Sequence, residues 1–579
     1  MMRRALAFGI LAVVLAAPGL PAVAGPAWMR VAEVRPGMRG TARTVVQGTG
    51  VESFDVQILE VVPGAGPAGD LILVRVSGPL IARTGGIAAG MSGSPVYVNG
   101  RLVGAIGFGW AFADHSLGLV TPIETMLGAL PPARSERRAL STPVQVGHRR
   151  LDRVAIVSTL TEALAAEAAA PNVAAMLPLT RPLLLSGISS RVADLLGAEL
   201  GPFGVTPVLS AAGGSTNVRP ELVPGSAIGV QLIRGDLNAV AIGTLTYRDG
   251  DTILAFGHPF LNRGKTRYLL TAASIQGVVP STSFPFKIGS AGSPLGIISE
   301  DRRAGIGGRI GILPPMVGVR TRVTDEDRGR TVTMTTQVLR DPQLGPLLTL
   351  VSALEAVDRA LDRVGEGTAR VRITMRARGL DAPLVRENVF YHPRDVGTAA
   401  MLELPEALRL LFANEFVQTG PVDVTIDVDV QQRQQTAAVI EGEVDRPRVR
   451  RGENATVRVT LRPFQGPPAV RVIELAVPEG FPAGPATILI RAGGRPMPEQ
   501  GLPALLTQEP VETPATSVAE QLSAFSERDR NTDLVVELVP GAARFPDGTT
   551  TAVRNVRVRI PTPWVIRGRV QIAIGVDPR

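Results

Sequence analysis

The stretch Gly90–Trp110 decides the fold, and it is written GMSGSPVYVNGRLVGAIGFGW. It places a serine between glycines, followed by a proline, a short apolar run, an Asn-Gly pair and a second apolar run. Two apolar runs separated by Asn99-Gly100 predict a β-hairpin. The glycines beside Ser92 permit the backbone angles of a tight turn. The stretch is therefore either the cradle of a nucleophile or a simple turn before a hairpin.

A serine hydroxyl is a poor nucleophile unless a turn exposes it, N–H groups face the developing oxyanion and a base accepts its proton. The turn meets the first two needs, and we predict the oxyanion hole at the N–H groups of Gly90 and Ser92. The order of proline, strand, glycine turn, strand and glycine-flanked aromatic resembles the segment after the nucleophile of chymotrypsin-like proteases. In those proteases the last strand binds the substrate backbone as an added strand, which implies this role for Ile106, Gly107, Phe108 and Gly109.

The candidates for the base are the four histidines of the chain. His258 follows the apolar run of DTILAFGHPF, where a strand gives way to a turn, a position that presents a ring to a cleft. His115, in the loop just after the serine hairpin, is its competitor. A serine–lysine pair with Lys265 is a third arrangement, but a lysine base needs burial to lower its pKa, and NRGKTRY is typical of a solvated segment.

Two longer stretches, TGGIAAGMSGSPVYVNGRLVGAI and AIGTLTYRDGDTILAFGHPF, together resemble the SpoIVB family of sporulation serine peptidases. The resemblance covers roughly residues 30–130 and 205–310 and implies a trypsin-like fold. It implies that Ser92 is the nucleophile, that His258 is the base and that the substrates are exported proteins cleaved in signalling or processing. The serine and histidine halves lie in swapped order here, which a catalytic triad tolerates because geometry defines it.

The acid of the triad is the departure from the family pattern. The family carries an aspartate shortly before T-G-G-I, and the matching position here is Ser77. Without an acid the imidazole loses its orienting partner and activity falls severely. We predict Asp70 as the third member, with Asp236 as the alternative. The missing acid keeps a second hypothesis open, a catalytically inactive protease fold that serves as a peptide-binding or scaffold protein of the cell envelope.

The N-terminus, MMRRALAFGILAVVLAAPGLPAVAG, combines a basic start, an apolar run and the small residues Ala22-Val23-Ala24. This pattern predicts a secretory signal peptide cleaved after Ala24. The apolar run is shorter than the ~20 residues that span a bilayer, and no later stretch is long and apolar enough. The chain has no cysteine, so no disulfide is available to it outside the cytoplasm. We expect a periplasmic or secreted protein without a transmembrane segment after signal cleavage.

The composition predicts a mainly β chain of several domains, because the 579 residues include 63 glycines and 48 prolines but only 4% aromatic residues. The formal charge of +8 comes almost wholly from arginine. No arginine cluster is interleaved with stacking aromatics, so we expect no nucleic-acid partner. We expect neither a metal nor a cofactor; the partners predicted are an exported protein or peptide substrate and an envelope partner of the C-terminal β region.

The predicted architecture is a pair of trypsin-like β-barrel units with a helical insert, followed by an α+β region and an immunoglobulin-like β-sandwich. We expect the active site to form between the two barrels. The predicted boundaries in chain order are 1–24 for the signal peptide, 25–130 for the serine barrel, 131–204 for the helical connection, 205–323 for the histidine barrel, 324–440 for the α+β region and 441–579 for the sandwich.

Overall fold

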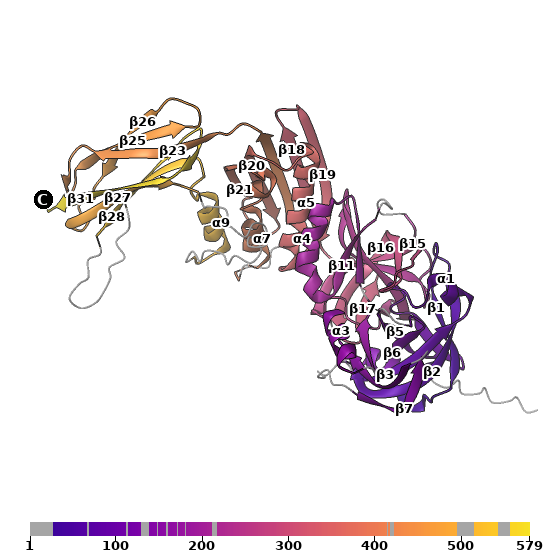
Figure 1. Cartoon of the computed structure of the whole chain (residues 1–579). Helices are drawn as coiled ribbons and strands as arrows, with labels where there is room; N and C mark the ends of the chain where they lie inside the picture. Colours follow the sequence, from indigo (N-terminus) through magenta and orange to yellow (C-terminus); the bar gives the residue numbers. More distant parts are fainter. Residues whose placement is uncertain are drawn as a thin grey trace, which may run out of the picture.

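The structure is a computed structural model. It describes residues 27–578 with the exception of 67–68, 112–113, 129–137, 147–148, 158–159, 171, 180, 211–216, 414, 417–421, 495–514 and 542–555. The predicted signal peptide lies outside the described residues. The chain forms two barrels, then a layer of strands beside a long helix, then a two-sheet body at the far end (Figure 1). The mainly β fold is confirmed.

Six antiparallel strands close the first barrel. They pair in the order β1–β2–β3–β6–β5–β4, and β4 returns to β1. The predicted hairpin is β4–β5, and its turn residues Asn99 and Gly100 have φ values of 51° and 76°, as a two-residue hairpin turn requires. The strands are β1 (Arg39–Thr44), β2 (Glu52–Gly66), β3 (Gly69–Ser77), β4 (Pro95–Val98), β5 (Arg101–Gly109) and β6 (Leu117–Pro122).

A second ring of six antiparallel strands has the order β12–β13–β14–β17–β16–β15, closed by the pairing of β15 with β12. The Asp249-Gly250 pair lies in the β13–β14 hairpin, where Asp249 pairs with Thr252. The trypsin-like barrels expected from the sequence are thus present. The strands are β12 (Ala227–Gly235), β13 (Asn238–Asp249), β14 (Thr252–Ala255), β15 (Gly264–Val279), β16 (Phe286–Arg302) and β17 (Gly305–Ile310).

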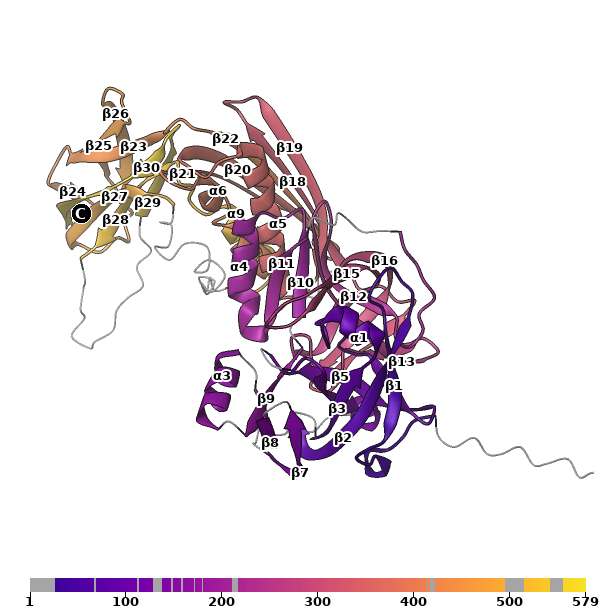
Figure 2. The ribbon, with the colours of Figure 1, turned by 45° about the vertical axis from the view of Figure 1, so that its right-hand side comes forward.

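The connection between the barrels differs from the predicted mostly helical insert, because it contains strands as well as helices. Short apolar runs such as VAAMLP have strand length, and their periodicity does not distinguish them from buried helix. β9 extends the sheet of the first barrel beside β5, and β10 extends that of the second beside β13 (Figure 2). The elements are β7 (Arg138–Val146), β8 (Arg149–Ile156), α3 (Leu160–Ala169), β9 (Val173–Pro178), β10 (Arg181–Ser186), α4 (Ser190–Leu200) and β11 (Val205–Leu209).

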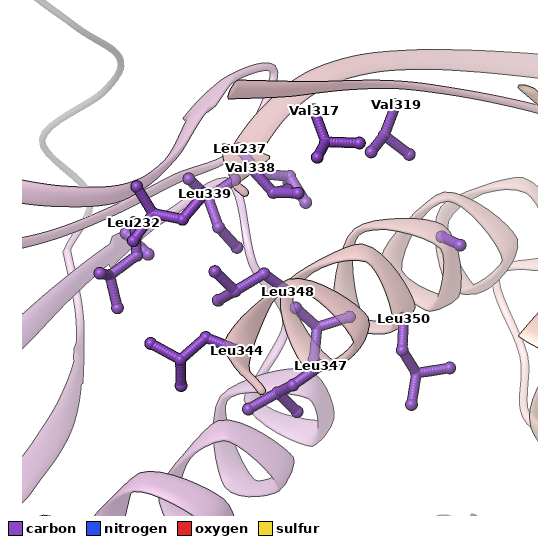
Figure 3. Close-up of a cluster of buried hydrophobic side chains, with 14 of the residues drawn as sticks. Leu232, Leu237, Val317, Val319, Val338, Leu339, Leu344, Leu347, Leu348 and Leu350 are labelled. Carbon is purple, nitrogen blue, oxygen red and sulfur yellow. The ribbon is translucent and has the colours of Figure 1, made fainter. Parts of the chain in front are cut away.

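An α+β layer continues the sheet of the second barrel through β19, β18, β22, β20 and β21. Leucines at spacings of three and four pack one face of α5 on this sheet, and Figure 3 shows Leu348 next to Leu339. Nearly all of α5 is buried, because α4 and α7 cover its other sides. The elements are β18 (Met316–Asp325), β19 (Arg330–Leu339), α5 (Leu344–Leu361), β20 (Gly367–Ala377), β21 (Leu384–His392), α6 (Val396–Ala400), α7 (Leu404–Phe412) and β22 (Val422–Gln431).

Two sheets, β26–β25–β23–β30 and β24–β31–β27–β28–β29, share one apolar core in the C-terminal body. Its immunoglobulin-like character stays a prediction. Across the described ranges, no helix combines the length and hydrophobicity that crossing a membrane requires. Its strands are β23 (Thr436–Val444), β24 (Arg448–Arg450), β25 (Asn454–Pro463), β26 (Ala469–Ala476), β27 (Gly484–Ala492), β28 (Asp533–Pro540), β29 (Val556–Pro561), β30 (Val565–Arg567) and β31 (Arg569–Asp577). Helix α9 (Val518–Ser526) precedes β28 in the chain but packs on the α+β layer, against β21 and α7. Short helices η1 (Val31–Glu33), α1 (Pro79–Thr84), α2 (Ile123–Leu127) and η2 (Gly201–Phe203) complete the fold.

Candidate active site

The serine turn, residues Ala89–Ser94, leads directly into β4. From Ala89 to Gly93, bonded and unbonded N–H groups alternate: the Met91 N–H donates to the Ala88 carbonyl at 2.8 Å and the Gly93 N–H to the Ile106 carbonyl at 2.8 Å. Within the described residues, the N–H groups of Gly90 and Ser92 have no acceptor. Two unbonded N–H groups on a tight turn, with one residue between them, have the arrangement that an oxyanion hole requires.

The hydroxyl of Ser92 differs from that of Ser94. Ser94 is fully buried, and its Oγ donates to the Met91 carbonyl at 2.6 Å, a bond that holds the turn. Ser92 retains 4% of its surface, and its Oγ forms no hydrogen bond with the part of the chain that the structure describes. Of the two motif serines, Ser92 is therefore the one whose hydroxyl is free to react.

Strand β13 of the second barrel clamps the serine turn. The Thr244 N–H donates to the Ser92 carbonyl at 2.8 Å, and the Thr244 hydroxyl donates to the Gly90 carbonyl at 3.0 Å. The Thr246 hydroxyl donates to the Gly93 carbonyl at 2.8 Å. Gly93 packs so closely that a Cβ there would lie 2.0 Å from the Thr244 carbonyl oxygen. The turn is thus held by the barrel that carries the histidine.

His258 follows a backbone segment in the left-handed region, with φ at 71° for Phe256 and 68° for Gly257. A residue with a Cβ rarely adopts this backbone conformation. Backbone strain of this kind is common at functional sites. The Thr121 hydroxyl of the first barrel donates to the Gly257 carbonyl at 2.5 Å. That carbonyl oxygen would lie 2.4 Å from a Cβ at Gly107. The histidine segment thereby packs on the first barrel, as the serine turn packs on the second.

The His258 ring is fully buried, with Nδ1 2.7 Å from the Pro259 carbonyl oxygen. An Nδ1–H donated to this carbonyl leaves Nε2 as the acceptor nitrogen. Nε2 is buried and has no hydrogen-bond partner among the residues that the structure describes, and no hydrogen bond joins the ring to Ser92. Burial, and secondly the positive charge of Arg181, lower the pKa of His258 to about 3, while the Pro259 carbonyl opposes this shift. The ring is therefore neutral around neutral pH.

The two predicted acids lie elsewhere. The Asp70 carboxylate accepts from the Gly64 N–H at 2.8 Å, and the exposed Asp236 carboxylate accepts from the Thr335 N–H at 2.6 Å. Neither is hydrogen-bonded to His258. The Pro259 carbonyl holds Nδ1 instead, the contact that a triad acid makes in other serine proteases. The orienting group is therefore a backbone atom.

Asp301 of β16, which the sequence analysis missed, holds the loop after His258. Its two carboxylate oxygens accept from the N–H groups of Phe260 and Leu261, each at 2.7 Å. Burial raises the pKa of this carboxyl, whereas the backbone hydrogen bonds lower it. The pairing depends on the strand register of the second barrel, so no local sequence signal marks it.

Lys287 of β16 is the second residue that the sequence analysis missed. Its Nζ donates to the Thr44 hydroxyl at 2.8 Å and to the Thr244 hydroxyl at 3.5 Å. Its stem lies under the serine turn, where a Cβ at Gly90 would be 3.0–3.2 Å from it. Burial lowers the pKa of Lys287 to about 7. Lys265, the lysine considered in the sequence analysis, is exposed.

Lys287→Met is expected to remove a pH dependence of stability. Because burial lowers the pKa of Lys287 from 10.5 to about 7, the unfolded chain holds the extra proton between these values. Stability should therefore rise with pH in that window, by roughly 4–5 kcal/mol over its full width. Urea unfolding from pH 7 to 9.5, followed by tryptophan fluorescence, measures the rise. Lys265→Met should keep the wild-type rise; a Lys287→Met variant that also keeps it contradicts the prediction.

Comparison with known families agrees with the serine turn. The family model of the SpoIVB peptidase S55 matches residues 26–127, which include the first barrel and the serine turn but not His258. No curated protein and no solved structure gives a significant match to the chain. The likeness to the SpoIVB peptidase S55 family is thus shown for residues 26–127, the part of the chain that carries the serine turn.

Proposed function

We propose that the chain is an exported serine endopeptidase that cleaves exported proteins, with Ser92 as the nucleophile and His258 as the general base. The observation that carries the proposal is the unbonded Ser92 hydroxyl between two N–H groups without acceptors, on a turn of a peptidase-family domain. The signal peptide, with cleavage after Ala24, belongs to the same proposal.

The reaction would follow from the positions of these groups. Ser92 Oγ attacks the carbonyl carbon of the scissile bond, and its proton passes to His258 Nε2, the nitrogen left as acceptor. The N–H groups of Gly90 and Ser92 receive the oxyanion. His258 then protonates the leaving amine, and a water molecule hydrolyses the acyl-enzyme with His258 again as base. Proton transfer requires the Ser92 hydroxyl and Nε2 to come within hydrogen-bond reach, so the ring or the turn shifts when substrate binds.

The competing function is a catalytically inactive peptide-binding or scaffold protein. The observations that favour it are the lack of a carboxylate on His258 Nδ1 and a pKa of about 3, which makes the buried imidazole a weak base. Both functions use the same fold, so only a reaction at Ser92 separates them.

A fluorophosphonate probe tests the proposal, because it phosphonylates a serine only where that serine is activated. Digestion and mass spectrometry should locate the label on Ser92. Heat-unfolded protein should not be labelled, and Ser94→Ala should keep the label, since Ser94 Oγ is bonded to Met91. A label on Ser94 would contradict the assignment of Ser92 as the nucleophile, and no label on the folded protein would support the inactive scaffold.

A further inference from the structure

The edge of β5 on which a substrate strand is expected is covered by the chain itself. Strand β9 ends antiparallel to it, with Pro178 opposite Phe108 and Leu177 opposite Gly109. The Leu179 N–H then donates to the Gly107 carbonyl at 3.0 Å. The backbone of Leu177–Leu179 therefore makes the contacts by which an added peptide strand binds to a sheet edge.

The leucine side chains of this segment fill a fitted space. Leu179 is fully buried and Leu177 is 6% exposed. Leu179 packs on Gly109, where a Cβ would lie 2.8 Å from Leu179 Cδ2 and 2.8 Å from Phe284 Cε1. The missing side chain at Gly109 thus makes room for a leucine against an aromatic ring.

The same segment continues to the histidine. Arg181 Nη1 donates to the Phe260 carbonyl in the loop after His258, and its positive charge is the second cause of the low pKa of His258. Leu177–Leu179 thus contacts the β5 edge, and Arg181 contacts the loop that follows His258. A cavity of about 420 Å³ borders Leu177, Pro178 and Arg181, so the segment is not enclosed on every side.

We propose that Leu177–Leu179 is an internal occupant of the substrate site and that it displays the class of peptide the site accepts. That class is an extended strand with leucine at the residue bonded to the Gly107 carbonyl and proline before it. The inference rests on the proposed function, which makes the β5 edge a substrate site. Main-chain bonds to an edge tolerate any sequence, so the leucine space supplies the selectivity. A tethered occupant competes at millimolar effective concentration and lowers the apparent affinity for free peptide.

Peptide binding to a catalytically inert protein tests the inference. The probe is a fluorescein-labelled Met-Leu-Pro-Leu amide, measured by fluorescence anisotropy in a Ser92→Ala background. Adding Leu179→Ala should empty the leucine space and tighten binding about tenfold or more, because the competitor is weakened. Leu183→Ala is the matched control: Leu183 is an equally buried leucine on β10 that packs in a different core. Leu177→Ala is a second variant with the same expectation, in case Leu179→Ala fails to fold.

The outcomes separate this inference from the proposed function. The proposal that Leu177–Leu179 occupies the substrate site is supported if only the Leu177 and Leu179 variants bind the probe more tightly than the Ser92→Ala protein. This gain should be lost when the last leucine of the probe is replaced by aspartate. Equal binding in these variants and in the Leu183 control overturns it. If that binding pattern appears but fluorophosphonate never labels the chain that retains Ser92, the occupant stands and hydrolysis is refuted. If Ser92 is labelled while all variants bind the probe equally, only the occupant is refuted.

Discussion

His258→Gln is expected to lower kcat for a leucine-ending chromogenic peptide by about 10⁴-fold, and Ser92→Ala/His258→Gln should be no slower than Ser92→Ala. A nucleophile and its base act as one unit, so removing the second member after the first costs little more. Glutamine has nearly the size of the ring and keeps a donor for the Pro259 carbonyl, which preserves the buried packing. Residual hydrolysis then reports the oxyanion hole and binding alone.

His115→Gln is the control for this prediction. His115 lies in the first barrel, with Nδ1 3.2 Å from the Trp110 carbonyl oxygen and its ring 5.7 Å from that of Phe284. This replacement should change kcat only a few-fold. If His115→Gln abolishes hydrolysis while His258→Gln does not, the base is His115. If the losses in the Ser92/His258 double variant multiply, the two residues do not act together.

Gly93→Ala is expected to destabilise the barrel pair by more than about 3 kcal/mol and to abolish labelling of Ser92. Two costs combine at this position. Gly93 has a φ of 93°, and a Cβ there would lie 2.0 Å from the Thr244 carbonyl oxygen and 2.5 Å from the Phe256 nitrogen. Both neighbours are backbone atoms of the second barrel, so relief requires the barrels to separate. Urea unfolding and fluorophosphonate labelling measure the two effects.

Gly100→Ala separates the conformational cost from the clash. Gly100 in the β4–β5 turn has a φ of 76°, and no atom of the described part of the chain lies within 4 Å of a Cβ built there. Its replacement should lower the free energy of unfolding by about 1–2 kcal/mol, because alanine is unfavourable in the left-handed region of φ. It should leave labelling intact. Equal destabilisation by the two replacements would contradict a close approach of the serine turn to Thr244.

The features predicted correctly depend on local chemistry. Asn99-Gly100 identifies a hairpin, because few residues adopt the positive φ values of its turn. The motif around Ser92 likewise carries its turn within six residues, so the turn and its unbonded N–H groups follow from sequence. The closure of these strands into barrels is implied by the resemblance to the SpoIVB family, whereas the composition predicts only a mainly β chain.

The features missed depend on contacts between distant segments. Lys287 reaches the serine turn only because β16 lies beside it, with the Lys287 N–H donating to the Ala89 carbonyl at 2.9 Å. The group on His258 Nδ1 is a main-chain carbonyl, which no residue type reveals, so a search among aspartates selected Asp70 and Asp236. The segment that covers the β5 edge belongs to the connection between the barrels. The short apolar runs of this connection have no periodicity that distinguishes a strand from a buried helix.

The mutual clamping of the two key turns has a consequence for timing. A ribosome makes the N-terminal part of a chain first, so the serine barrel emerges before Thr244 and Thr246 exist to hold its turn. At that stage Gly90 and Gly93 lack their side-chain donors, and the histidine segment has not been made. Under the proposed function, the order of the barrels along the chain would leave Ser92 without its base until the second barrel is complete, which would protect the nascent chain and its neighbours from premature cleavage.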